Sequence, residues 1–161
     1  LYRSLTVYIE QHQETQPYLI PLGEQVEEVI RRLRERQISV QAALERLEGL
    51  AEQAVEAREE QARSDLSSEE FALCWVLKGQ GVAAPEEAAR TVHRILAEHP
   101  GWTYNPRVER EVRVALYKTL TPPLRKAIGE ALGPMQAEAR RANLLKETVD
   151  ALLRMAEVVA P

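Results

Sequence analysis

Apolar residues recur at intervals of three or four positions along most of the chain, which is the spacing of one buried helix face. The clearest stripe has five aliphatic members: Leu22, Val26, Val29, Ile30 and Leu33. A second stripe follows Ser39, a residue type that favours the N-cap of a helix, and the helix extends to about Arg63. Its members are Val40, Ala43, Leu44, Leu47, Leu50, Ala51, Ala54 and Val55. No segment alternates apolar and polar residues as a half-buried strand would, so the sequence predicts an all-α fold.

The two strongest stripes are separated only by the short break at residues 37–39. Helices joined by so short a connection usually pack antiparallel. We therefore expect a multi-helix domain with a long, protruding antiparallel helical hairpin over residues 22–63, preceded by a shorter helix from Tyr2 to about Glu14. The predicted division is residues 1–63, the N-terminal helices and hairpin, and residues 64–161, a C-terminal helical bundle. One continuous domain is the alternative.

Helix starts and stops are also marked in the second half of the chain. Residues 67–70 read S-x-x-E, a capping box, just before an apolar run. Pro85 suits the first turn of a helix, and Asn105 followed by proline marks another start. We expect that helix to cover residues 106–120 and to break at Pro122 and Pro123. A short helix to 132, a break at 133–134 and a last helix over 135–159 complete the prediction.

Charge and cysteine content narrow the function classes. The chain has 21 basic and 25 acidic residues, a net charge of −4, whereas a dedicated nucleic-acid module is usually basic. A single cysteine cannot form a disulfide within the chain, which favours a cytoplasmic location. No apolar run approaches the ~20 residues of a membrane span, so no membrane association is expected. The chain begins with Leu1 rather than methionine, which favours a piece of a larger protein.

The residue types that usually carry catalysis or metals are sparse. His12, His93 and His99 lack the spacing of a zinc site, and we expect them at the surface or at helix ends. Cys74 has no neighbouring base and is expected to be a small core residue. Asp65 is one of only two aspartates, so no Asp-rich magnesium cluster is indicated. Residues 79–81 are glycine-rich but lack a Walker lysine. The sequence therefore predicts no catalytic, cofactor-binding or metal-binding residue.

One surface signal is basic and lies on the predicted helix over residues 106–120. Four cations fall opposite the apolar stripe of that helix, and they are the candidate contacts for a partner or for phosphate: Arg107, Arg110, Arg113 and Lys118. Glutamates at 109 and 111 lie among them, so a solvated, salt-bridged face is the competing interpretation. Trp102, which follows a Pro-Gly turn, is predicted to be a buried packing anchor at the start of this helix.

Three stretches together resemble a known family. They are residues 21–30 with 37–50, residues 66–73, and residues 89–95 with 101–102 and 107–116. Their order and spacing are similar to the C-terminal helical region of the restriction (R) subunit of type I restriction-modification enzymes, over roughly residues 17 to 120. Gly101 stands where that family tends to have Asp, and Thr-Pro-Pro after Leu120 replaces a lysine-rich ending.

The resemblance implies a function that composition does not. The parent would be an ATP-dependent type I site-specific deoxyribonuclease, with a nuclease domain and two RecA-like motor domains that use ATP and magnesium. The helical region would contain none of those active sites and no cofactor. It would dock the DNA translocase onto the methyltransferase and specificity subunits, so that DNA is reached indirectly. Two other hypotheses stay open: a nucleic-acid-binding helical domain that uses the basic helix 106–120, and a self-associating helical adaptor that forms a homodimer.

Overall fold

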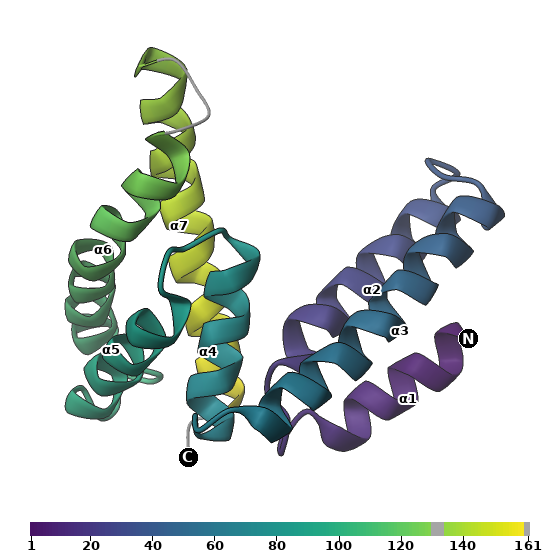
Figure 1. Cartoon of the computed structure of the whole chain (residues 1–161), viewed down its shortest axis with the longest axis horizontal. Helices are drawn as coiled ribbons and strands as arrows, with labels where there is room; N and C mark the ends of the chain where they lie inside the picture. The colour runs from purple at the N-terminus through teal and green to yellow at the C-terminus, as the bar shows by residue number, and fades with distance from the viewer. Residues whose placement is uncertain (130–133, 160–161) are drawn as a thin grey trace. The chain divides into compact units, whose positions relative to one another are not determined.

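The computed structural model describes the backbone of residues 1–129 and 134–159, and the side chains of residues 1–125, 140 and 142–158. Within that part of the chain it contains seven α-helices and no strand, which confirms the predicted all-α class (Figure 1). The helices form two compact units, residues 1–68 and 69–161. The predicted division after residue 63 coincides with the end of a helix close to this boundary.

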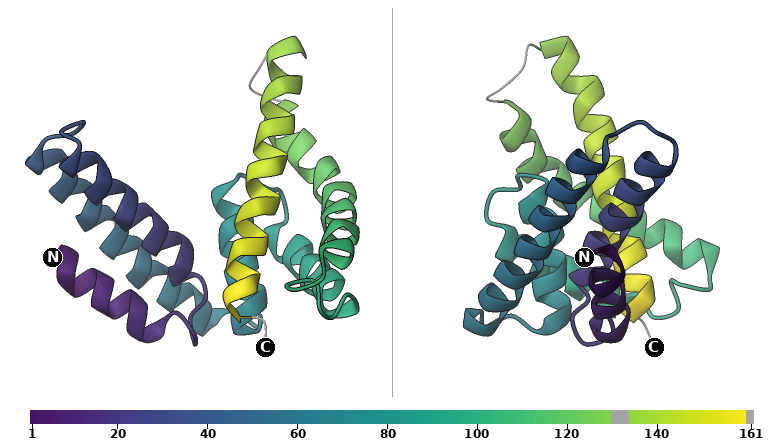
Figure 2. Two further views of the ribbon diagram at one scale, coloured as in Figure 1. Left: turned by 180° about the vertical axis from the view of Figure 1, so that it is seen from behind. Right: turned by 90° about the vertical axis from the view of Figure 1, so that its right-hand side faces the viewer.

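The first unit contains three helices: α1 (Tyr2–His12), α2 (Leu19–Arg34) and α3 (Val40–Arg63). Helices α2 and α3 run in opposite directions and lie side by side in each view, while α1 packs on α2 (Figures 1 and 2). The buried apolar side chains come from all three helices: Leu5, Ile9, Leu19, Leu22, Val26, Val29, Ile30, Ala43, Leu47, Leu50, Ala54 and Ala57. The α2–α3 pair is therefore not a bare arm, because α1 covers part of its apolar surface.

Local signals fix the ends of these helices. The Ser39 hydroxyl accepts a hydrogen bond from the backbone N–H of Ala42 at 3.1 Å, as expected of an N-cap. Helix α2 begins at Leu19, earlier than the predicted Leu22, so Pro21 lies in its first turn. A proline is tolerated there because the N–H groups of a first turn have no partner within the helix.

The connection from α2 to α3 closes α2 with two backbone hydrogen bonds. The N–H of Gln37 donates to the carbonyl of Arg32 at 2.9 Å, and the N–H of Arg36 donates to that of Leu33 at 3.1 Å. This pair of bonds defines a Schellman motif, which needs a left-handed residue after the helix. Arg36 takes that role with φ of 57°.

The second unit contains α4 (Ser68–Gly79), α5 (Pro85–Glu98), α6 (Pro106–Gly129) and α7 (Pro134–Val159). Helix α6 packs against both α5 and α7. The described core includes Phe71, Leu73, Leu77, Val92, Trp102, Val112, Leu116, Leu120, Leu152 and Leu153. Trp102 is 8% exposed, which confirms its predicted burial, and Cys74 is buried as expected.

The predicted break at Pro122 and Pro123 is wrong, because α6 continues through both prolines to Gly129. Each proline removes one backbone donor from the helix. Leu120 and Leu124, four residues apart on either side, are both almost fully buried, so burial of this face outweighs the lost hydrogen bonds. The predicted break at 133 falls outside the described residues, and α7 begins at Pro134.

Candidate docking surface

The four predicted contact residues of α6 divide into two groups. Arg107, with a side chain 84% exposed, Arg110 and Lys118 lie on the outer surface of the helix. Arg107 Nε is 3.4 Å from Glu111 Oε1, and Arg110 Nε donates to the carbonyl of Pro106 at 3.1 Å. Neighbouring acceptors of the same helix therefore engage two of these three cations.

Arg113 instead ties α6 to α7 inside the second unit. Its Nη1 is 2.6 Å from Asp150 Oδ1, and its Nε is 2.8 Å from Glu109 Oε1. The hydrogen bonds that Arg113 donates to Asp150 and, second in effect, to Glu109 raise the pKa of its guanidinium. With both carboxylates already bound to it, this guanidinium serves packing within the unit. A small polar pocket of about 270 Å³ beside it is lined by Trp102 and by further charged side chains of α7.

The histidines lie at the surface or at helix ends, as the sequence indicates. His12 Nδ1 is 2.8 Å from the carbonyl of Tyr8 at the end of α1, and His99 Nδ1 is 2.7 Å from that of Ile95 at the end of α5. His93 Nε2 is 2.9 Å from Glu69. Among the described residues, no three His, Cys, Asp or Glu side chains are grouped so that they could hold a metal ion.

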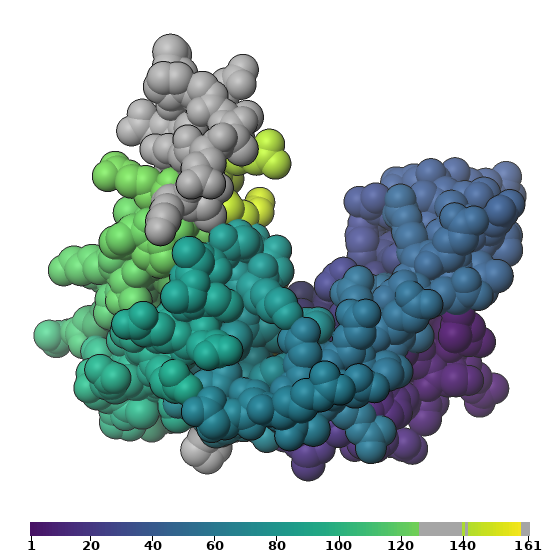
Figure 3. All heavy atoms as spheres, in the orientation of Figure 1, coloured from purple at the N-terminus to yellow at the C-terminus, as the bar shows by residue number. Residues whose placement is uncertain are grey.

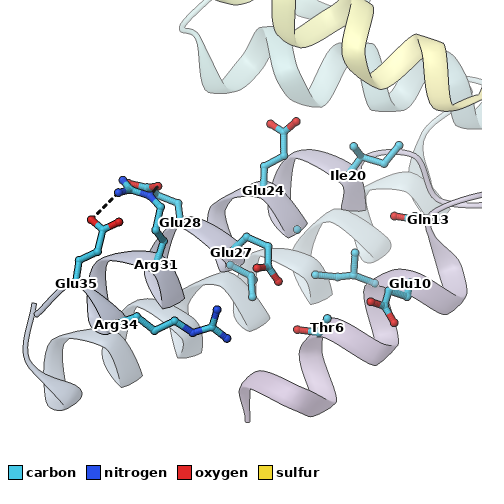
Figure 4. Close-up of a pocket in the computed structure, with 13 residues that line it drawn as sticks. Thr6, Glu10, Gln13, Ile20, Glu24, Glu27, Glu28, Arg31, Arg34 and Glu35 are labelled. Atoms are coloured by element: carbon cyan, nitrogen blue, oxygen red, sulfur yellow. Dashed lines mark hydrogen bonds and ion pairs between the residues drawn. The ribbon is translucent and has the colours of Figure 1, made fainter. Parts of the chain in front are cut away.

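A first groove in the N-terminal unit lies between α1 and α2, and charged side chains surround it (Figure 4). Arg31 binds Glu28 and Glu35, in each case at 2.7 Å. Hydrogen bonds from Arg31 and Arg32 lower the pKa of Glu28 to about 2, so this carboxylate stays ionised. Because these opposite charges satisfy each other, much of the polar rim of this groove is already paired.

The close approach of α1 to α2 at this groove depends on one glycine. A Cβ atom at Gly23 would lie 3.2 Å from Cγ2 of Ile9, which is tighter than ordinary van der Waals contact. A side chain at position 23 would therefore require Ile9 to shift by a few tenths of an ångström, so glycine favours the close packing of α1 on α2.

A second groove lies between α1 and α3, with a volume of about 540 Å³. In Figure 3 the purple atoms of α1 lie beside the blue atoms of α3. The walls are mainly apolar and include Leu1, Leu5 and Tyr8 from α1 and Ala51, Ala54 and Val55 from α3. Val55 is 59% exposed and Leu1 is 53% exposed, so aliphatic side chains are open to solvent here.

Helix α3 carries a buried apolar line and a second, exposed apolar line. Ala43, Leu47 and Leu50 are buried, whereas Leu44 is 46% exposed and Val40 is 74% exposed. The sequence prediction combined both faces into one stripe. The signal was present, since the members of that stripe cover a wider arc than one helix contact needs.

An acidic ridge follows the groove along α3. It consists of five glutamates at intervals of three or four residues: Glu45, Glu48, Glu52, Glu56 and Glu59. Residues 1–68 contain 13 acidic and 8 basic residues, a net charge of −5, while residues 69–161 contain 12 and 13, a net charge of +1. The negative charge of the chain thus belongs to the unit that carries the groove.

The lining of the α1–α3 groove is suited to binding. The groove has mainly apolar walls, and Arg58 and Glu59 are the charged residues among those that line it. None of the described helices is both long enough and apolar enough to cross a membrane. Comparison of the chain with family models, with curated proteins and with solved structures gave no match.

Proposed function

We propose that this chain is a helical docking module that holds a partner protein and performs no catalysis itself. The observation that carries the proposal is the α1–α3 groove, where aliphatic side chains of both helices are open to solvent. Exposed apolar side chains that gather in one concave place are typical of contact surfaces. Val55 lies on its wall and is the natural position at which to test the proposal.

Charge favours protein over nucleic acid as the partner of this groove. The unit that carries it has a net charge of −5, and the acidic ridge lies beside it. Duplex DNA presents a dense row of phosphates, and binding to it normally relies on Lys and Arg contacts. A phosphate backbone would therefore be repelled from this face.

The resemblance of residues 17–120 to the restriction subunit suggests which proteins dock. We propose that they are the methyltransferase and specificity subunits of a type I restriction complex, in a cytoplasmic setting. ATP and magnesium would then be used by the motor and nuclease domains of the parent protein. DNA would be reached only through that larger complex.

Co-purification tests this proposal directly. The affinity-tagged chain is expected to retain the methyltransferase and specificity subunits, and Val55→Asp is expected to release them by placing a charge in the apolar groove. Val158→Asp is the matched control, because Val158 is also about half exposed but lies on α7, outside both candidate surfaces. Failure to retain either subunit, or equal loss with both variants, would argue against docking through this groove.

The outer face of α6 supports a second candidate, contact with nucleic acid. Arg107 and Arg110 are exposed there, and Lys118 makes no ion pair with any residue that the structure describes. Tight duplex binding with a steep salt dependence, lost when these three residues become Ala, would favour this candidate. If the chain instead sediments as a dimer and binds neither partner, self-association becomes the better account.

A further inference from the structure

We propose that the α1–α3 groove accepts an amphipathic helix of the partner whose polar flank is basic. This inference rests on the docking function proposed above and adds the chemistry of the docked segment. Two roughly parallel helices with aliphatic side chains between them form a groove that can bind a third helix. The lining from Ala51 to Ala62 spans about 16 Å along α3, which corresponds to about three helical turns.

The apolar line of α3 also continues past the groove. Leu44 and Val40, both exposed, extend the line of Ala51 and Val55 toward the start of α3. These residues recur at multiples of about one helical turn, so they lie on one side of the helix. An incoming helix with apolar residues at i, i+3, i+4 and i+7 would match this line over a longer stretch.

The charge of the docked helix follows from the unequal rims of the groove. On α3, beside the residues that line the groove, Glu48, Glu52 and Glu56 are exposed and make no ion pair with any described residue. On the α1 side the polar lining residues are the uncharged Ser4 and Tyr8, and the charged lining residues, Arg58 and Glu59, both come from α3. A helix with Lys or Arg along one flank would therefore meet unpaired carboxylates on one side only, which also fixes its orientation.

Binding of a synthetic probe to the full chain tests the proposal. The probe is a fluorescein-labelled peptide of about 14 residues with leucines at i, i+3, i+4 and i+7 spacing and lysines elsewhere. Its comparator replaces every lysine by glutamate. Fluorescence anisotropy is expected to show binding of the lysine peptide and binding at least about tenfold weaker for the glutamate peptide. No binding of the lysine peptide, or equal binding of both, would overturn the proposal.

Variants of the chain then locate the site. Val55→Asp is expected to weaken binding of the lysine peptide about tenfold. The substitution removes one apolar contact and adds a charge that must be desolvated. A triple variant is expected to weaken binding of the lysine peptide by a similar factor and to make that binding less dependent on salt. It carries Glu48→Gln, Glu52→Gln and Glu56→Gln. All four positions are exposed, and unchanged circular dichroism of each variant verifies folding.

A second triple variant with the same change in net charge distinguishes an effect of the ridge from general electrostatic attraction to the acidic unit. Glu10→Gln, Glu14→Gln and Glu24→Gln remove three exposed carboxylates from the same unit, away from the ridge. These changes are expected to alter affinity less than about twofold. If they weaken binding as much as the ridge variant does, or if Val55→Asp has no effect, the peptide is not in the groove.

The two proposals can fail separately. If the partner subunits are retained and Val55→Asp releases them, but the lysine and glutamate peptides bind alike, docking stands and the basic helix is wrong. If the partner subunits are not retained while the lysine peptide binds with the expected variant pattern, the groove chemistry stands and the named partners are wrong.

Discussion

Arg36, in the turn between α2 and α3, has a left-handed backbone conformation with φ of 57°. A side chain in this region is strained by roughly 1 kcal/mol because Cβ crowds the backbone. Gly81 takes the same place after α4, where the N–H of Val82 donates to the carbonyl of Leu77 and that of Gly81 to Lys78. The two helix ends therefore use one motif with different residues.

Arg36→Gly is expected to raise the free energy of unfolding by about 1 kcal/mol, because glycine adopts this conformation without the Cβ penalty. Urea unfolding followed by circular dichroism measures the change. Gly81→Ala is the matched control and should lower stability by a similar amount, since a Cβ there meets no neighbour within 4 Å and only the backbone is strained. A destabilised Arg36→Gly variant would mean that the arginine side chain contributes more than its strain.

At the scale of elements, α3 explains why an apolar residue on a helix need not belong to the core. Leu47 is 5% exposed, whereas Leu44, three residues earlier, is 46% exposed. Leu47→Ala is expected to cost about 2–5 kcal/mol, and Leu44→Ala less than about 1 kcal/mol. Thermal or urea unfolding of the two variants measures the difference. Similar losses at both positions would mean that α3 buries both faces in solution.

The same helix shows how far sequence reasoning reaches. The Ser39 cap and the three-to-four spacing predicted α3 correctly, because both are local properties of the chain. Which of its two apolar lines faces the core depends on α1 and α2, and periodicity does not contain that information. The prolines of α6 are the opposite case, since local rules predicted a break and burial of Leu120 and Leu124 outweighed them.

The basic cluster on α6 could be predicted only in part for the same reason. Spacing placed Arg113 with Arg107 and Arg110, away from the apolar stripe. Its partner Asp150 is 37 positions further along the chain, on α7. A long-range ion pair of this kind leaves no periodic signal, so the sequence could not distinguish an inter-helix contact from a free cation.

At the scale of the whole molecule, the two units can be followed by different spectroscopic signals. Both tryptophans, Trp75 and Trp102, lie in residues 69–161, whereas helices of both units contribute to circular dichroism. If the units unfold independently, Leu47→Ala is expected to shift the circular dichroism transition in urea while the tryptophan fluorescence transition stays in place. An equal shift of both transitions would show that the chain unfolds as one cooperative body.

The acidic ridge has a consequence for the timing of binding. Charges that remain at the rim of a contact act mainly during approach, whereas apolar side chains at its centre act mainly after contact is made. For a basic helix arriving at the groove, the five glutamates would set the association rate constant, and added salt would lower it. Val55 and its apolar neighbours would set the residence time, which salt should leave nearly unchanged. The ridge thus makes the association rate constant depend on salt, whereas the apolar groove leaves the dissociation rate constant nearly independent of salt.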